Sequence, residues 1–426
     1  MSFSKLLNKK VFFFLFFLAL FSAAFYVFSL FTAIPNNIRL TYGSEKNLDF
    51  RLPARAVFEP EAISVLSVNN KPVTENIAFR LSDDVTLSAT GSGSTQMTVN
   101  AFGIPLRRVQ IDVLPNIEVI PVGMAVGVRI NSDGLMVLGV GPVTAADGTA
   151  KSPCEGLLQS GDLLIYANSQ RLSNKEQLMQ IIRNSKEFVY FKVKRDNTVS
   201  NIKIPTVKDS NGESRIGVWV RDSTQGIGTI TYYNPATGRF AALGHGVQDV
   251  DTKKLMNVKG GFIMDSQITS VRKALKGSPG ELIGNINTSS ILGYVKHNSN
   301  YGIYGTLEIA AIPNFPGEKF KIGLKDSIRT GPAKILSCVD GNQVREYDVY
   351  IETVNRNTSD DTKGMIVRIT DPALLARTNG IVQGMSGSPI IQDGRLIGAI
   401  THVFVQDPTK GYGIFIENML AEEARH

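Results

Sequence analysis

Residues 384–400 have the sequence Gly-Met-Ser-Gly-Ser-Pro-Ile-Ile-Gln-Asp-Gly-Arg-Leu-Ile-Gly-Ala-Ile. Two apolar runs, 389–391 and 395–400, flank the Gln-Asp-Gly of 392–394, which strongly indicates a β-hairpin. The glycines near Ser386 predict a tight turn just before that hairpin. A serine hydroxyl needs a base to become a good nucleophile, and acyl transfer also needs backbone N–H groups beside the developing oxyanion. Ser386 is therefore a candidate nucleophile, although a Gly/Ser surface loop fits the same residues.

The pattern G-x-S-G-x-P at 384–389 resembles the nucleophile motif of chymotrypsin-like serine proteases. This resemblance implies that Ser386 attacks the substrate. It also implies that the N–H groups of Gly384 and Ser386 form the oxyanion hole. The hairpin that follows would then form a wall of the substrate cleft.

The chain has four histidines that could supply the general base. His245 follows an apolar run and lies between two glycines, which leave an imidazole open to a partner. It precedes Ser386 in the chain, in the order His then Ser of the chymotrypsin type. His402, in the apolar segment after the serine turn, fits better as a wall or core residue, and His297 fits an exposed loop. We expect His245 to be the base.

The acid that would orient the base is less clearly marked. Asp371 lies 15 residues before the serine, at the end of a predicted strand. It fits equally well as the N-cap of a helix that begins at Pro372. Asp249, Asp251 and Asp265 follow the candidate base in the chain and are further candidates for the acid.

Composition limits the class of protein. The 426 residues are 43% hydrophobic and 19% charged, which argues against wholesale disorder. The 39 glycines favour turn-rich β structure over a helical bundle. A net charge of +7 is too mild to indicate nucleic-acid binding. Two cysteines, Cys154 and Cys338, without a CxxC pair exclude a disulfide framework and a cysteine-based zinc site, and we expect neither a metal nor a cofactor.

The N-terminus predicts contact with a membrane. Residues 11–34 are uncharged and mostly apolar, and lysines at 5, 9 and 10 precede them. A run of this length can span a bilayer, and the lysines keep the N-terminus cytoplasmic. The rest of the protein would then lie outside the cytosol. A cleaved signal peptide is the alternative, in which case the mature protein is secreted.

We predict a mostly β, multidomain protein with four segments. Residues 1–35 form the signal anchor, and 36–115 form a small β domain of short alternating strands. Residues 116–207 form a PDZ domain, and 208–426 form a serine peptidase domain of many short strands.

The PDZ prediction depends on the run SP…GL…GD.I…N at 152–168 and on a helix predicted at 173–182. Their order and spacing resemble a PDZ domain of the bacterial protease type. In PDZ domains a chain end, or an internal segment, adds as a strand beside a glycine-containing loop. The residues that match this loop and strand are Gly123, Met124, Ala125, Val126, Gly127 and Val128.

Three further motifs occur together with the anchor and the PDZ-like segment. They are ALGHG…D.DTKK at 242–254, TDP.LL at 370–375, and a block at 379–413 around the serine turn. The combination resembles the SpoIVB peptidase family over residues 116–420, and implies a chymotrypsin-like β-barrel peptidase domain.

Residue by residue, this resemblance places the family's catalytic histidine, aspartate and serine on His245, Asp371 and Ser386. Gly246 departs from the family pattern, which commonly has a hydrophobic residue after the histidine. The resemblance implies a self-processing serine endopeptidase exported from the forespore into the space between two membranes. Its partner would be a membrane-bound inhibitor complex of an intramembrane metalloprotease, and cleavage of the extracytoplasmic part would trigger sigma-factor activation during sporulation. The alternative is a non-catalytic PDZ adaptor, a pseudoprotease, of the cell envelope.

Overall fold

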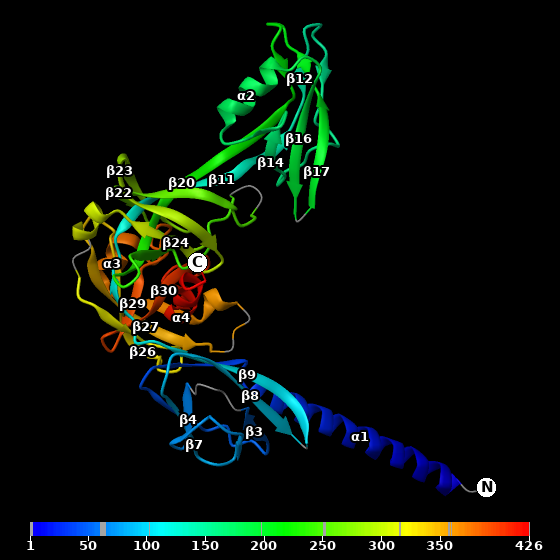
Figure 1. The fold of residues 1–426 in the computed structure, drawn as a ribbon, viewed down its shortest axis with the longest axis vertical. Helices are drawn as coiled ribbons and strands as arrows, with labels where there is room; N and C mark the ends of the chain where they lie inside the picture. Colours follow the sequence, from blue (N-terminus) through cyan, green and yellow to red (C-terminus); the bar gives the residue numbers. More distant parts are fainter. Residues whose placement is uncertain are drawn as a thin grey trace. The chain divides into compact units, whose positions relative to one another are not determined.

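The computed structural model describes residues 3–59, 65–101, 103–196, 198–249, 253–314, 317–356, 358 and 360–425. These form two compact units, Met1–Ile117 and Glu118–His426. The first begins with helix α1 (Phe3–Ala33). Its stretch Phe13–Ala33, with mean hydropathy 2.3, is long and apolar enough to cross a membrane, a test that a signal sequence also passes (Figure 1).

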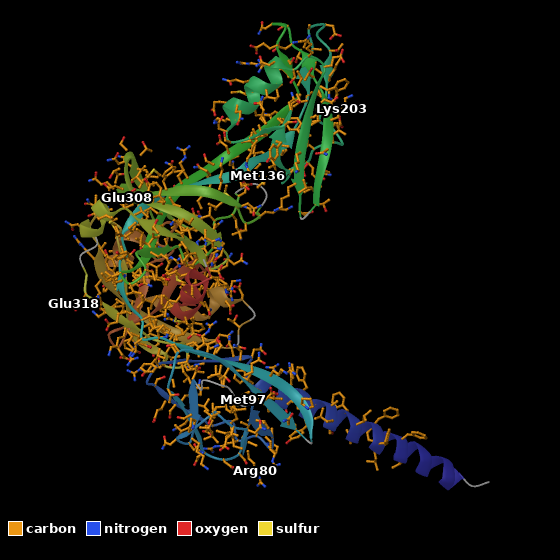
Figure 2. All side chains as sticks on the ribbon, viewed as in Figure 1. Arg80, Met97, Met136, Lys203, Glu308 and Glu318 are labelled. Atoms are coloured by element: carbon orange, nitrogen blue, oxygen red, sulfur yellow. The ribbon has the colours of Figure 1, made fainter. Side chains whose placement is uncertain are left out.

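The rest of the first unit consists of β-strands. They are β1 (Asn37–Thr41), β2 (Glu45–Leu48), β3 (Arg55–Phe58), β4 (Leu66–Val68), β5 (Lys71–Pro72), β6 (Ile77–Arg80), β7 (Val85–Ala89), β8 (Gly93–Ala101) and β9 (Ile104–Leu114). One sheet has the order β1-β9-β8-β3-β6 and another the order β2-β7-β4-β5. Alternate side chains of these strands are buried, among them Met97 of β8 (Figure 2), so the domain has its own apolar core.

The second unit contains a first closed barrel. Its strands are β11 (Ala125–Val140), β20 (Val218–Asn234), β21 (Arg239–Ala242), β22 (Val258–Arg272), β23 (Glu281–Ser299) and β24 (Gly302–Leu307). Antiparallel pairing follows the order β11-β20-β21-β24-β23-β22, and β22 pairs back with β11. Apolar side chains such as Val126, Phe240 and Ile303 fill the interior.

A second barrel follows. Its strands are β26 (Gly331–Ser337), β27 (Arg345–Val354), β28 (Met365–Ile369), β29 (Pro389–Gln392), β30 (Arg395–Val403) and β31 (Lys410–Phe415). They pair antiparallel in the order β26-β27-β28-β31-β30-β29, and β29 pairs back with β26. The predicted hairpin is confirmed as β29–β30, with Asp393 and Gly394 both at positive φ in the turn. Two closed antiparallel barrels in sequence are the architecture expected of a chymotrypsin-like fold.

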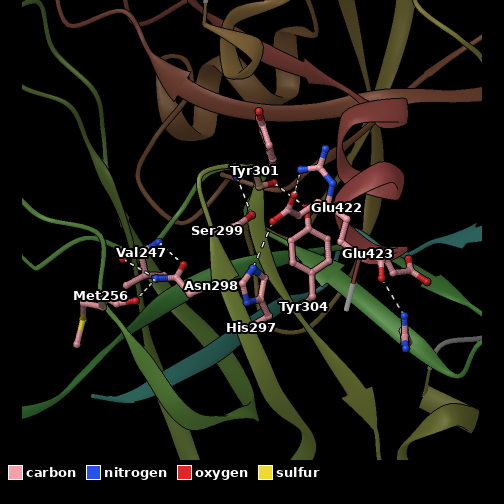
Figure 3. Close-up of polar contacts among 11 residues, drawn as sticks. Val247, Met256, His297, Asn298, Ser299, Tyr301, Tyr304, Glu422 and Glu423 are labelled. Carbon is pink, nitrogen blue, oxygen red and sulfur yellow. Dashed lines mark hydrogen bonds and ion pairs between the residues drawn. The ribbon is translucent and has the colours of Figure 1, made fainter. Parts of the chain in front are cut away.

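Short elements join the two barrels. They are β10 (Glu118–Pro121), the 3-10 helices η1 (Ile309–Asn314) and η2 (Asp361–Lys363), β25 (Phe320–Ile322), α3 (Pro372–Thr378) and α4 (Ile416–Glu423). Strand β25 pairs with both β10 and β30. Helix α4 follows the last strand of the second barrel, yet Glu423 accepts a 2.7 Å hydrogen bond from Tyr232 of the first, and Glu422 lies 3.3 Å from His297 (Figure 3). The C-terminal helix therefore holds the two barrels together.

A separate lobe with its own core extends from the first barrel. Its remaining elements are β12 (Val143–Thr144), β13 (Ala150–Lys151), β14 (Leu163–Ala167), β15 (Gln170–Arg171), α2 (Lys175–Asn184), β16 (Phe188–Arg195), β17 (Thr198–Pro205), β18 (Val207–Lys208) and β19 (Ser214–Arg215). Helix α2 forms where the sequence predicts a helix, with Asn174 rather than Ser173 as its N-cap. It buries Leu178, Ile181 and Ile182 against the sheet.

The structure changes the predicted division between 116–207 and 208–426. Strands β11 and β20 each run through both the barrel and the lobe. Their barrel halves pair residues 125–131 with 223–229, and their lobe halves pair residues 136–140 with 218–221. The lobe is thus an insertion into the first barrel, because two paired strands leave that barrel and return to it.

The structure also contradicts the prediction that Gly123, Met124, Ala125, Val126, Gly127 and Val128 bind a peptide strand. Val126 pairs with Gly228 on one edge and with Asp265 on the other. Both edges are occupied at residues 126–128, so an added strand finds no free backbone edge there. A Cβ at Gly127 would lie 2.3 Å from the side chain of Ile286, which explains that glycine by barrel packing.

This topology predicts that the barrels fold without the lobe. Asn131 and Ser223 are paired, so an Asn-Gly turn that replaces residues 132–222 should close β11 and β20 into a hairpin. The deletion removes Arg221, the ion-pair partner of the fully buried Asp249 carboxylate. The substitution Asp249→Asn should therefore accompany the deletion, so that no unpaired charge stays buried. We expect a cooperative thermal transition, measured by circular dichroism. The full-length Asp249→Asn variant is the control. A deletion variant that shows no cooperative transition, while this control does, would contradict the insertion topology.

Candidate active site

A cavity of about 1090 Å³ brings the candidate catalytic residues together. His245 enters it from the loop after β21, and Ser386 from the turn before β29. The nucleophile and the base thus come from different barrels. Apolar side chains from both barrels, such as Ile227 and Val403, line the same space.

The turn that carries the nucleophile needs its glycines. Gly384 has φ +99° and Gly387 has φ +96°, in a region that disfavours residues with a Cβ. A Cβ at Gly387 would also lie 2.1 Å from the carbonyl oxygen of Thr229. The backbone N–H of Thr229 donates to Ser386 O (3.1 Å), and its hydroxyl donates to Gly384 O (2.7 Å). Strand β20 therefore holds the turn from the other barrel.

Neighbouring hydrogen bonds fix the directions of the Gly384 and Ser386 N–H groups, which are the predicted oxyanion donors. The carbonyls that precede Gly384 and Ser386 accept hydrogen bonds from Leu282 N (2.8 Å) and Ser388 N (3.0 Å). A trans peptide points its C=O and N–H in opposite directions, so these bonds fix the direction of both N–H groups. Neither N–H has a protein acceptor within the described residues. Two oriented donors without partners are what an oxyanion hole requires.

His245 is in the tautomer that a general base needs. Its Nδ1 lies 3.0 Å from the carbonyl oxygen of Gly246, which can only accept, so Nδ1 carries the proton and Nε2 is free to accept one. Burial lowers the pKa of His245 below the usual 6.5. A Cβ at Gly246 would lie 2.5 Å from Ser299 O, so this departure from the family pattern allows close packing of the histidine loop.

The nucleophile is in a resting position. Ser386 Oγ donates a 2.7 Å hydrogen bond to the carbonyl oxygen of Thr401. Catalytic hydrogen bonds are often long or misaligned before substrate binds. Rotation about χ1 of Ser386 would release its hydroxyl from Thr401 O and let it donate to a base in the cavity.

The structure does not place Asp371 against His245. Its Oδ1 accepts a hydrogen bond from Leu374 N (2.9 Å) and its Oδ2 one from Asp348 N (3.4 Å). Asp371 is the N-cap of α3, whose first residue is Pro372, and it does not line the cavity. Of the two roles that the sequence allowed for Asp371, helix N-cap and triad acid, the structure shows the helix N-cap.

Neither Asp249 nor Asp265 contacts His245. Asp249 is fully buried and forms a 2.9 Å ion pair with Arg221 of β20. Asp265 lies within β22, and Asp251 lies outside the described residues. The acceptor for His245 is thus a backbone carbonyl, which no side-chain pattern could reveal.

The remaining histidines have different surroundings. His297 lies next to Glu422 of α4, away from the cavity. His402 lines the cavity, and its ring centroid is 4.7 Å from that of His245. The wall position predicted for His402 agrees with this placement, but the contact between the two imidazoles was not predicted, because the rings come from different barrels.

Other chemistry has little support within the described residues. They contain no group of three or more His, Cys, Asp and Glu side chains placed to hold a metal ion. Burial raises the pKa of the Cys154 thiol to about 12 and raises that of Cys338. A buried thiol with a raised pKa is not a nucleophile at neutral pH.

The lowered pKa of His245 predicts the pH dependence of the reaction of Ser386. A general base acts when neutral, and a lowered pKa keeps it neutral to lower pH, so activity is lost only as pH falls through that lowered value. We expect the acid limb of the labelling rate with a fluorophosphonate to have its midpoint below 6.5. A midpoint at or above that value would contradict the burial of His245.

Asp371 gives a second prediction. Asparagine caps helices as well as aspartate does, so Asp371→Asn should retain both stability and the labelling rate of Ser386. Asp371→Ala should lose about 1 kcal/mol of unfolding free energy, measured by urea denaturation, with the labelling rate retained. A loss of more than about a hundredfold in Asp371→Asn at unchanged stability would return this residue to a catalytic role.

Comparison with known proteins agrees with this geometry. Residues 212–420 match the family described as SpoIVB peptidase S55. No curated protein matches the chain. A PDZ domain of an SdrC-like protein from Listeria monocytogenes is 20% identical, covering 21% of this chain and 87% of that chain with TM-score 0.17. The HtrA-type protease AlgW with decapeptide is 16% identical, covering 48% and 53% with TM-score 0.28.

Similarities this low carry no weight for the fold, which follows from the strand pairings themselves. The family match, in contrast, covers His245, Gly384 and Ser386. Through residues 212–420 the chain belongs to the SpoIVB peptidase S55 family, and the protein is a serine endopeptidase.

Proposed function

We propose that this endopeptidase acts outside the cytosol, on itself and on the extracytoplasmic part of a membrane-bound regulatory complex. The complex would restrain an intramembrane metalloprotease, and its cleavage would lead to sigma-factor activation during sporulation. The family match and the apolar N-terminal helix support this proposal. One observation carries the catalytic proposal above the others: Ser386, His245 and Gly384 line one cavity. Nδ1 of His245 lies 3.0 Å from Gly246 O, and the N–H groups of Gly384 and Ser386 have no protein acceptor within the described residues.

The chemistry follows from these positions. Nε2 of His245 takes the proton of Ser386 Oγ as the oxygen bonds to the scissile carbonyl carbon. The N–H groups of Gly384 and Ser386 bind the oxyanion of the tetrahedral intermediate. His245 then gives the proton to the departing amine, which leaves an acyl group on Ser386. Water, deprotonated by the same histidine, releases the acyl group and restores the enzyme.

Peptide recognition by the lobe needs a free strand edge. Over residues 218–221 strand β20 pairs with β11, and no other strand of the described chain pairs with it there. Helix α2 contacts β20, and Lys175 N at its start donates to the Asp222 carboxylate (3.2 Å). A strand edge beside a helix is the arrangement that PDZ domains use for peptides. We therefore propose the edge of β20 at residues 218–221 as the peptide-binding edge, in place of the segment Gly123–Val128 that the sequence predicted.

The experiment compares the full chain with Ser386→Ala. Wild-type protein should be labelled by a fluorophosphonate at Ser386 and should shorten itself near the N-terminus, measured by N-terminal sequencing. Removing the nucleophile should abolish labelling and lower cleavage by up to about 10⁶-fold. Added to the extracytoplasmic part of a regulatory complex, only wild-type chain should yield fragments by mass spectrometry. Cleavage undiminished in Ser386→Ala would falsify the assignment of the nucleophile.

The alternative is a non-catalytic adaptor of the cell envelope that binds through its PDZ-like lobe. It predicts no adduct with the probe even though the protein is folded, and binding of partner peptides without cleavage. Labelling of folded wild-type protein, absent in Ser386→Ala, would exclude the adaptor.

A further inference from the structure

The rings of His245 and His402 meet across the two barrels, tilted relative to each other. Their ring centroids are 4.7 Å apart and their planes differ by 34°. His245 lies in the loop after β21 of the first barrel, and His402 lies on β30 of the second. Both rings line the cavity of Ser386. Aromatic rings at this separation attract each other.

The base needs an anchor in the second barrel. The backbone beside His245 is held by residues of the first barrel: Val247 N donates to Asn298 Oδ1 (2.8 Å), and Asn298 Nδ2 donates to Val247 O (2.8 Å). The carbonyl on Nδ1 of His245 belongs to the next residue and moves with the same loop. That bond sets the tautomer but cannot fix the ring relative to a nucleophile in the other barrel.

His402 is suited to be that anchor. It follows Thr401, whose carbonyl oxygen holds Ser386 Oγ at 2.7 Å. The ring that contacts the base and the group that holds the nucleophile are therefore adjacent on one strand. No hydrogen bond joins His402 to Ser386 or His245 within the described residues, so its contact with His245 is through the two rings.

The charges around His402 matter, because the imidazolium that forms on His245 repels a second cation. Lys363 of η2 faces His402 and forms a 2.8 Å ion pair with Asp360. The other charged groups that line the cavity are Asp249, paired with Arg221, Asp361, which accepts from Tyr301, and Lys253. The His402 side chain is exposed, and partial desolvation together with the neighbouring histidine lowers its pKa below the usual 6.5. His402 is thus neutral at the pH where His245 works.

We propose that His402 is a positioning residue, which packs against the imidazole of His245 and fixes that ring relative to Ser386. The inference rests on the serine peptidase chemistry proposed above. It differs from a role as a substrate wall, because a wall changes the binding of substrate, whereas a misplaced base slows the reaction of bound substrate.

The test measures how fast a fluorophosphonate labels Ser386 in the full chain, as a function of probe concentration and pH. In this reaction Ser386 Oγ bonds to phosphorus, fluoride leaves, and the proton passes to His245. His402→Phe keeps an aromatic ring and should keep the maximal labelling rate within about threefold. His402→Ala should lower that rate about tenfold or more, with the half-saturating probe concentration unchanged.

The His402→Lys variant should change the pH dependence of labelling, which would stay the same if His402 only stabilised the fold. A permanent cation beside His245 disfavours its protonation, so the acid limb should move to lower pH while the maximal rate falls. His297→Ala is the matched control, because His297 contacts Glu422 away from the cavity, and it should change neither quantity. Thermal unfolding of each variant shows whether it is folded. If His402→Ala does not fold, the labelling rates of His402→Phe and His402→Lys test the positioning role of His402.

Three outcomes would overturn the inference. One is a maximal rate in His402→Ala equal to that of wild type. Another is an equal loss in His402→Phe and His402→Ala, which would indicate that the ring nitrogens, and not the contact between the rings, matter. The third is a changed half-saturating concentration alone, which would indicate a substrate wall. If folded wild-type protein is not labelled at all, the proposed function fails, and the inference fails with it.

Discussion

Thr229 connects the two barrels at the point where catalysis takes place. Its N–H and its hydroxyl, both on strand β20, donate to the carbonyls of Ser386 and Gly384 in the second barrel. Each bond contributes only about 0.5–1.5 kcal/mol. Their effect on geometry is larger, because they restrict the turn whose N–H groups must face the oxyanion. The absent side chain of Gly387 allows Thr229 O to come this close.

The same strand continues from the barrel into the inserted lobe. Arg221, on its lobe half, forms an ion pair with the fully buried Asp249, which follows the histidine in the chain. A buried carboxylate without its partner is costly, so this pair ties the histidine loop to β20. Strand β20 thus contacts the loop of the base through Arg221 and the turn of the nucleophile through Thr229.

How much of this could be predicted depends on whether the information is local. The glycines and Ser386 define their turn by local sterics, and the Gln-Asp-Gly turn defines its hairpin in the same way, so both were predicted correctly. Asp371 was ambiguous, because an aspartate before a proline fits both an N-cap and a triad acid. The segment Gly123–Val128 resembles a PDZ strand locally, but pairing with residues 223–229 and 258–265 decides its place, and no local pattern carries that pairing.

The replacement of a carboxylate by the Gly246 carbonyl has a definite chemical consequence. In the Ser-His-Asp template, changing the acid to its amide costs about 10⁴ in kcat, mainly because the histidine adopts the wrong tautomer. A carbonyl accepts and never donates, so it enforces the correct tautomer without a negative charge. What it does not supply is attraction for the imidazolium, and burial of His245 further disfavours the charged form.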